Sequence, residues 1–122
     1  MNEKSSLSEI GYLVVRVTTA LGAIPLENAA VTVRGDSDEN ADVIYSLTTN
    51  SDGNTERIPL PTPPKSNSAS PNEALPYATY SIDVFADGYS PLHLSNVPVF
   101  SSIISIQPAT MLPVIEGENL RR

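Results

Sequence analysis

Residues 48–55 read Thr-Thr-Asn-Ser-Asp-Gly-Asn-Thr, and they separate two runs in which apolar and polar residues alternate. Glycine readily adopts the positive φ that a tight turn needs, so Asp52-Gly53 predicts a sharp reversal of the chain. In such a turn the side chains of Asn50 and Ser51 can bond to nearby backbone groups, and threonine suits the pleated positions on either side. We therefore expect a turn that joins two strands, in a domain built from β-structure.

Strands are predicted on both sides of this turn, because apolar and polar residues alternate at the period of two that a strand requires. In the first strand Leu13, Val15 and Val17 share one face, and Asn96 interrupts the sixth strand. No segment shows the period of a helix, so we expect an all-β fold, a seven-stranded antiparallel β-sandwich of two packed sheets. The seven expected strands span residues 11–18, 29–34, 43–47, 57–60, 80–86, 91–100 and 104–112.

A single domain is expected over residues 11–113, because a chain of 122 residues with 40% apolar content leaves little room for a second core. Residues 1–10 are predicted to form a flexible N-terminal segment, and residues 114–122 a C-terminal tail or linker. Residues 61–76 are rich in Pro, Ser and Asn. Proline disfavours helices and central strands, so this stretch is predicted to be a long exposed loop.

The charge of the chain narrows the range of partners. Its formal net charge is −7, with only seven Lys and Arg residues, which are scattered. Nucleic acids and anionic membrane surfaces are bound chiefly through clustered basic residues, so we expect neither as a partner. No apolar run approaches the roughly 20 residues of a membrane-spanning helix, so no membrane insertion is expected. The first ten residues are too polar for the apolar core of a secretory signal.

The chain resembles the carboxypeptidase-regulatory-like module, and more narrowly a branch found at the head of spore-cortex-lytic and peptidoglycan-binding proteins of Gram-positive spore formers. The resemblance covers residues 11–113. It implies a transthyretin-like sandwich that serves as a non-catalytic accessory module beside a peptidoglycan-binding or hydrolase domain. The phrases that carry it are residues 22–31, the turn at residues 49–53, Tyr80 with Asp87-Gly88-Tyr89, and the stretches 58–64, 76–80, 96–100 and 105–108.

The inventory of catalytic side chains is small, with one histidine and no cysteine. A nucleophile activated by an imidazole base would have to use His93. Leu92 and Leu94 flank His93, and alternation places the imidazole on the face opposite to theirs. We therefore interpret His93 as a solvent-facing strand residue, and we expect no enzyme activity and no cofactor.

A calcium loop is the one metal site that the sequence suggests. Asp36, Asp38, Asn40 and Asp42 place oxygen-bearing side chains at alternate positions, as the first part of such a loop does. The position where a bidentate Glu should close the site is Leu47, so any site would be weak. The alternative interpretation is an acidic, solvated loop between two strands.

A surface for partners is predicted at Tyr12 and Tyr77, the tyrosines best placed for exposure, and at Pro63 and Pro64 in the proline-rich loop. Proline lowers the entropy that a segment loses when a partner docks, and tyrosine rings can stack on sugars. We expect a structural interaction module associated with cell-wall or spore-cortex proteins. The alternatives are a module that binds carbohydrate, specifically a peptidoglycan fragment, and a homo-oligomer that assembles through exposed strand edges.

Overall fold

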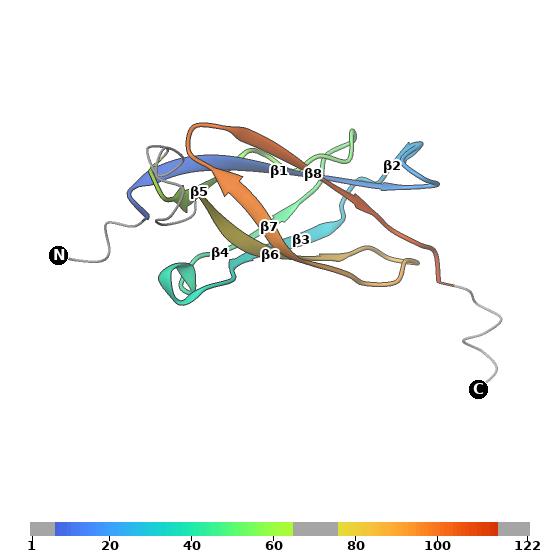
Figure 1. The fold of residues 1–122 in the computed structure, drawn as a ribbon. Coiled ribbons are helices and arrows are strands. Elements are labelled where there is room, and N and C mark those ends of the chain that lie inside the picture. Colours follow the sequence, from blue (N-terminus) through green and yellow to red (C-terminus); the bar gives the residue numbers. More distant parts are fainter. Residues whose placement is uncertain (1–6, 65–75, 115–122) are drawn as a thin grey trace.

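Two β-sheets pack face to face in the computed structural model, which describes residues 7–64 and 76–114 (Figure 1). The predicted all-β sandwich is confirmed. The first sheet contains β1 (Glu9–Thr19), β2 (Ile24–Pro25), β5 (Ile58–Thr62) and β8 (Ile104–Thr110). The second contains β4 (Ile44–Thr48), β3 (Ala30–Gly35), β6 (Tyr77–Phe85) and β7 (Leu92–Phe100), paired in that order, and a short 3-10 helix, η2 (Asp38–Asn40), joins β3 to β4. The seven predicted strands correspond to seven of these eight, and the two-residue β2 was not expected.

One strand pair departs from the antiparallel expectation. β8 runs parallel to β1, in a register that pairs Tyr12 with Ile104. The reason lies in the connection from β7, because the N–H of Ser102 donates to the carbonyl of Ile10 at 2.8 Å and the N–H of Tyr12 donates to the carbonyl of Ile103 at 2.9 Å. The chain therefore leaves the second sheet beside the start of β1, and β8 continues in the direction of β1.

The turn at residues 48–55 forms as predicted, but it does not close a hairpin. Gly53 has φ +80°, and the side-chain oxygen of Asn50 accepts the N–H groups of Asp52 and Asn54 at 2.9 and 3.1 Å. The strand before the turn, β4, belongs to the second sheet, whereas β5 belongs to the first. The prediction that the turn simply reverses one strand into the next was therefore wrong. The turn carries the chain from one sheet to the other.

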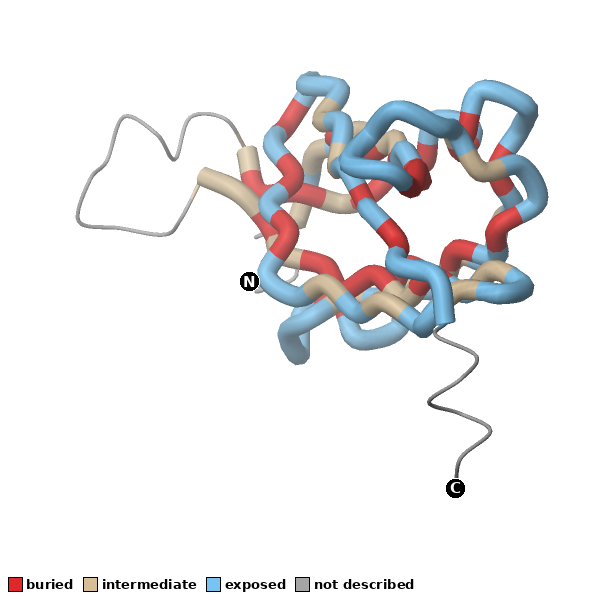
Figure 2. Tube along the Cα trace, turned by 90° about the vertical axis from the view of Figure 1, so that its right-hand side faces the viewer, coloured by how far each residue is buried: buried red, intermediate tan, exposed pale blue. Residues whose placement is uncertain are grey.

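The core lies between the two sheets, and the predicted alternation decides which side chains enter it. Buried and exposed positions alternate along the strands (Figure 2). Leu13, Val15 and Val17 of β1 are all fully buried, as predicted. Facing them from the second sheet are further buried side chains, among them Val31, Val33, Tyr80, Ile82, Val84, Val97 and Val99.

The predicted interruption of the sixth strand is a β-bulge in β7. Tyr80 pairs with Val97 and Ile82 with Leu94, so two residues of β7 lie opposite Ser81 alone. Asn96 takes φ +57° at this point, and its N–H donates to a carboxylate oxygen of Asp36 at 2.9 Å. The bulge is therefore held by the side chain of Asp36, the first residue after β3.

Three predicted segments lie wholly or partly outside the described residues. These are the flexible N-terminal segment, the tail after residue 114 and most of the proline-rich loop between β5 and β6. At the N-terminal end β1 begins at Glu9, two residues earlier than the expected domain boundary. Within residues 7–64 and 76–114, no helix is long and apolar enough to cross a membrane.

Tyr80 makes the stability of the fold depend on pH in the alkaline range. Its side chain is 0% exposed, and its hydroxyl donates to the carbonyl of Pro61 in the first sheet at 2.6 Å. Burial raises the pKa of Tyr80 from 10.0 to about 12, because the phenolate would lose its hydration. The folded state thus keeps its proton more tightly than the unfolded chain, so this contribution is complete below pH 10 and is lost between pH 10 and about 12. We expect the denaturant midpoint to fall steeply over that window, and a Tyr80→Phe variant to show a flatter profile. If the denaturant midpoint falls equally steeply with pH in both proteins, the pH dependence does not come from Tyr80.

Candidate functional site

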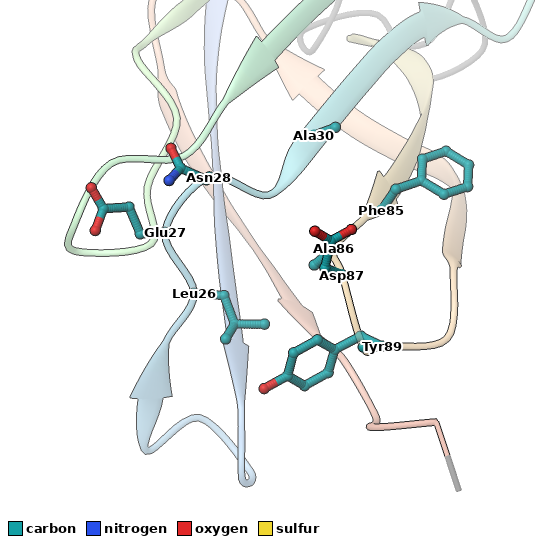
Figure 3. Close-up of a pocket in the computed structure, with 9 residues that line it drawn as sticks. Leu26, Glu27, Asn28, Ala30, Phe85, Ala86, Asp87 and Tyr89 are labelled. Atoms are coloured by element: carbon teal, nitrogen blue, oxygen red, sulfur yellow. The ribbon is translucent and has the colours of Figure 1, made fainter. Parts of the chain in front are cut away.

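A hollow of about 570 Å³ opens at one end of the sandwich. Two segments line it (Figure 3). The first leads from β2 into the start of β3, and the second comprises the end of β6 and the turn that follows it. We call it the loop-end hollow. Its lining residues are Leu26, Glu27, Asn28, Ala30, Phe85, Ala86, Asp87, Gly88 and Tyr89.

The first wall of the loop-end hollow is fixed by Thr49, which comes from the turn at residues 48–55. Thr49 is 3% exposed, its hydroxyl oxygen accepts the N–H of Ala29 at 2.9 Å, and the same hydroxyl donates to the carbonyl of Leu26 at 2.6 Å. Between these two points Asn28 takes φ +65°, and its N–H donates to the carbonyl of Thr49 at 3.0 Å. The bends of this wall are therefore set by one buried threonine.

The second wall is a tight turn held against the C-terminal segment. The N–H of Tyr89 donates to the carbonyl of Ala86 at 3.1 Å, and Gly88 between them has φ +85°. The carbonyl of Gly88 accepts the N–H of Val114 at 3.0 Å, so the described end of the chain braces the turn. Phe85, the last residue of β6, pairs with Ala30 of β3, and this pairing joins the two walls at their base.

The side chains of the loop-end hollow give it an acidic, acceptor-rich character. Glu27 and Asp87 bring one carboxylate from each wall, and Asn28 adds an amide. Leu26 and Tyr89 point toward one another beside Asp87 (Figure 3). No basic side chain lines the hollow, and among the described residues neither carboxylate has an ion-pair partner. The arrangement can bind a cation or a group rich in N–H and O–H donors.

The calcium candidates do not converge on one point. Asp36 accepts hydrogen bonds from the Ser81 hydroxyl and from the N–H of Asn96. Asn40 is 2% exposed, and its amide donates to the carbonyl of Thr79 at 3.1 Å. These two side chains are engaged in tying the loop between β3 and β4 to β6 and β7.

The remaining two calcium candidates, Asp38 and Asp42, are exposed to solvent. Nowhere in residues 7–64 and 76–114 do three His, Cys, Asp or Glu side chains lie close enough together to hold a metal ion.

The four residues predicted for the partner surface do not form one exposed surface. Tyr12 lies in β1 of the first sheet, where the guanidinium carbon of Arg57 is 5.5 Å from the centre of its ring. Tyr77 lies in β6 of the second sheet and packs against Phe100, with 5.3 Å between the ring centres. Pro63 is buried and Pro64 is half-buried.

His93 lies where the alternation predicts. Its side chain is 59% exposed, and its Nδ1 lies 2.7 Å from a carboxylate oxygen of Asp83 on the neighbouring strand. Leu92 and Leu94 on either side pack against the core. The pair of His93 and Asp83 lies on the outer face of the second sheet, and neither residue lines the loop-end hollow.

The loop-end hollow itself was missed from the sequence. In the sequence analysis Glu27, Asn28 and Asp87 occur only within the phrases that carry the family resemblance. A usable signal was present, because Asn28 comes just before the second predicted strand and Asp87 just after the fifth. If those two strands were known to be antiparallel neighbours, both residues would be expected at the same end of a sheet.

No protein-family model and no curated protein sequence matches the chain. Solved structures with a similar fold include the TIE protein of Bacillus anthracis, with a TM-score of 0.56 and 17% identity over 87% of this chain and 17% of that chain. Catechol 1,2-dioxygenase from Acinetobacter sp. ADP1 has a TM-score of 0.60 and 14% identity over 89% of this chain and 54% of that chain. GBS52, the minor pilin of Streptococcus agalactiae, has a TM-score of 0.54 and 14% identity over 88% of this chain and 46% of that chain. The chain thus spans about half or less of each of these proteins.

These structures correct one expectation. Catechol and hydroxyquinol dioxygenases recur among them, at 11–15% identity. The sandwich is therefore a fold that enzymes also use, and the expectation that the chain is not an enzyme is contradicted. At this level of identity the likeness shows the fold alone, a β-sandwich shared by a pilin, a TIE protein and dioxygenases.

Proposed function

We propose that this chain is an interaction module of a cell-wall-associated protein, and that it binds a basic side chain of a partner protein in the loop-end hollow. The observation that carries the proposal is that each wall of the hollow holds an acid, Glu27 on one wall and Asp87 on the other, and that neither acid has a basic partner among the described residues. The net charge of −7 adds a long-range attraction for a basic segment.

The hollow offers a lysine or arginine three kinds of contact. Carboxylates form charge-assisted hydrogen bonds with ammonium and guanidinium groups. The ring of Tyr89 can attract the same cation through its face, and Leu26 gives an apolar surface for the methylene stem. The association with the cell wall is supported by the minor pilin among the similar structures and by the resemblance to modules of peptidoglycan-binding proteins.

A peptidoglycan fragment is the second candidate ligand, and Tyr89 is the observation that favours it. Its half-buried ring lines the same hollow as Glu27, Asn28 and Asp87, whose side chains carry hydrogen-bond acceptors. Aromatic rings stack on the apolar faces of sugars, while acceptors of this kind bind hydroxyl and amide groups.

Titration of the isotope-labelled protein with tetralysine, followed by NMR, tests the proposal. We expect amide shifts concentrated in residues 26–30 and 85–89, and no such shifts with tetralysine whose side-chain amines are acetylated. Asp87→Asn and Glu27→Gln should each weaken binding by up to about fivefold, the size expected of one exposed charge contact. Asp38→Asn is the matched control, because this exposed acid lies near the opposite end of β3.

Two outcomes count against binding of a basic side chain. Shifts spread evenly over the acidic surface, with Asp38→Asn as harmful as Asp87→Asn, would indicate unspecific attraction and overturn the proposal. Shifts in the loop-end hollow with soluble peptidoglycan fragments but not with tetralysine would replace it with the second candidate.

A further inference from the structure

The edge strands of this sandwich differ in whether they contain proline. Among the described strands β2, β5 and β8 each pair with β1 alone, and β4 and β7 end the second sheet. Four of these five edges carry proline, which removes a backbone donor and hinders the addition of another strand. The prolines are Pro25 in β2, Pro59 and Pro61 in β5, Pro98 in β7 and Pro108 in β8. β4 has the sequence Ile-Tyr-Ser-Leu-Thr, with neither proline nor charge.

The hydrogen bonds of β4 show which of its backbone groups face outward. The carbonyl of Val43 accepts the N–H of Gly35, and the N–H of Thr49 donates to the carbonyl of Ala29, so residues 43 and 49 face β3. In an antiparallel pair successive residues alternate between the two sides of the strand. The N–H and C=O groups of Ile44, Ser46 and Thr48 therefore point toward the open edge, where no described strand pairs with them.

We propose that two copies of this chain associate through β4, antiparallel about a two-fold axis at Ser46, so that the second sheets of both copies become one continuous sheet. In this register Ser46 lies opposite Ser46 of the second copy, Ile44 lies opposite Thr48, and Tyr45 lies opposite Leu47. Each outward N–H and C=O of β4 then has a partner. The surface used is the edge of β4 and not the loop-end hollow, so the proposal stands independently of the proposed function.

The sequence of β4 favours a second copy as the occupant of the edge. Tyr45 and Leu47 are half-buried on the inner face, where they pack against the core, and an aromatic ring opposite an aliphatic side chain is a favourable cross-strand pair. On the outer face Ile44 is 58% exposed and would pair with a threonine, which suits a strand. The chain carries a net charge of −7, yet the self-pairing of β4 places no like charges opposite one another.

Sedimentation of the whole chain over a wide range of concentration tests the proposal. We expect a dimer whose fraction rises with concentration. Ser46→Pro removes the donor at the centre of the edge without touching the β3–β4 ladder, and it should weaken dimerisation at least about tenfold. Ser46→Lys keeps that donor but places two ammonium groups opposite one another, and it should weaken the dimer as well.

The control is Ser95→Lys, the same change at an exposed position of β7 on the other edge of the same sheet. It should leave dimerisation unchanged. Circular dichroism and denaturant unfolding of each variant separate loss of pairing from loss of folding. A chain that stays monomeric at every concentration overturns the proposal, even if its edge captures an unrelated extended peptide. A dimer that tolerates both changes at Ser46 overturns it too.

Discussion

Gly53→Ala is expected to lower the free energy of unfolding by about 3 kcal/mol or more, through two effects at one position. Gly53 has φ +80°, a conformation that costs an L-residue about 1–2 kcal/mol. A Cβ built on Gly53 would also lie 2.5 Å from the carbonyl oxygen of Val17. That carbonyl accepts the N–H of Leu26, and the N–H of Val17 donates to the carbonyl of Gly53 at 2.7 Å, so the backbone cannot shift without straining both bonds. Denaturant unfolding measures the loss.

Gly88→Ala separates the two effects. Gly88 has φ +85°, almost the same as Gly53, but a Cβ built on it would meet nothing within 4 Å. We therefore expect only the conformational cost, about 1–2 kcal/mol. Similar losses for the two variants would show that the contact with Val17 is absorbed by small movements, and would contradict the view that the turn is clamped against β1.

The faces of the strands could be predicted from the sequence because burial has the same period as the strand. Leu13, Val15 and Val17 are fully buried as expected, and so is Tyr80 with its neighbours on the same face of β6. β8 is the exception. Ile104 and Ile106 are 48% and 55% exposed on its outer face. Alternation can locate such a strand, but it cannot say which of its two faces meets the core.

Pairing could not be predicted, because the period of a strand says nothing about its neighbour. From residues 48–55 the geometry of the turn was predicted correctly, but the pairing of the strands that it joins was not. Two strands joined by a short turn usually pair, whereas β4 and β5 belong to different sheets. The parallel pairing of β8 with β1 was missed for the same reason. The loop-end hollow depends on the pairing of Ala30 with Phe85, residues far apart in the chain, so its acidic residues could be seen in the sequence but not brought together.

Thr49→Val is expected to lower the free energy of unfolding by about 2–3 kcal/mol. Valine has nearly the shape of threonine, so the change removes the hydroxyl and little else. The N–H of Ala29, a fully buried residue, would lose its acceptor at 2.9 Å, and the carbonyl of Leu26 would lose its donor at 2.6 Å. Both groups belong to the first wall of the loop-end hollow. We therefore expect the variant to bind tetralysine more weakly as well as to be less stable.

Thr62→Val also replaces a buried threonine with valine, but here the structure predicts that the free energy of unfolding rises. Thr62 is 0% exposed, and its hydroxyl oxygen has no hydrogen-bond partner among the described residues. An unpaired hydroxyl in the core destabilises the folded state, so valine should raise the free energy of unfolding by up to about 1 kcal/mol. Calorimetry or denaturant unfolding measures the stability of both variants. Each variant loses one hydroxyl, so a difference between them reports the hydrogen bonds that this hydroxyl makes in the folded state. A loss of stability in Thr62→Val would contradict the view that its hydroxyl is unpaired, and unchanged or higher stability in Thr49→Val would contradict the role given to the hydrogen bonds of Thr49.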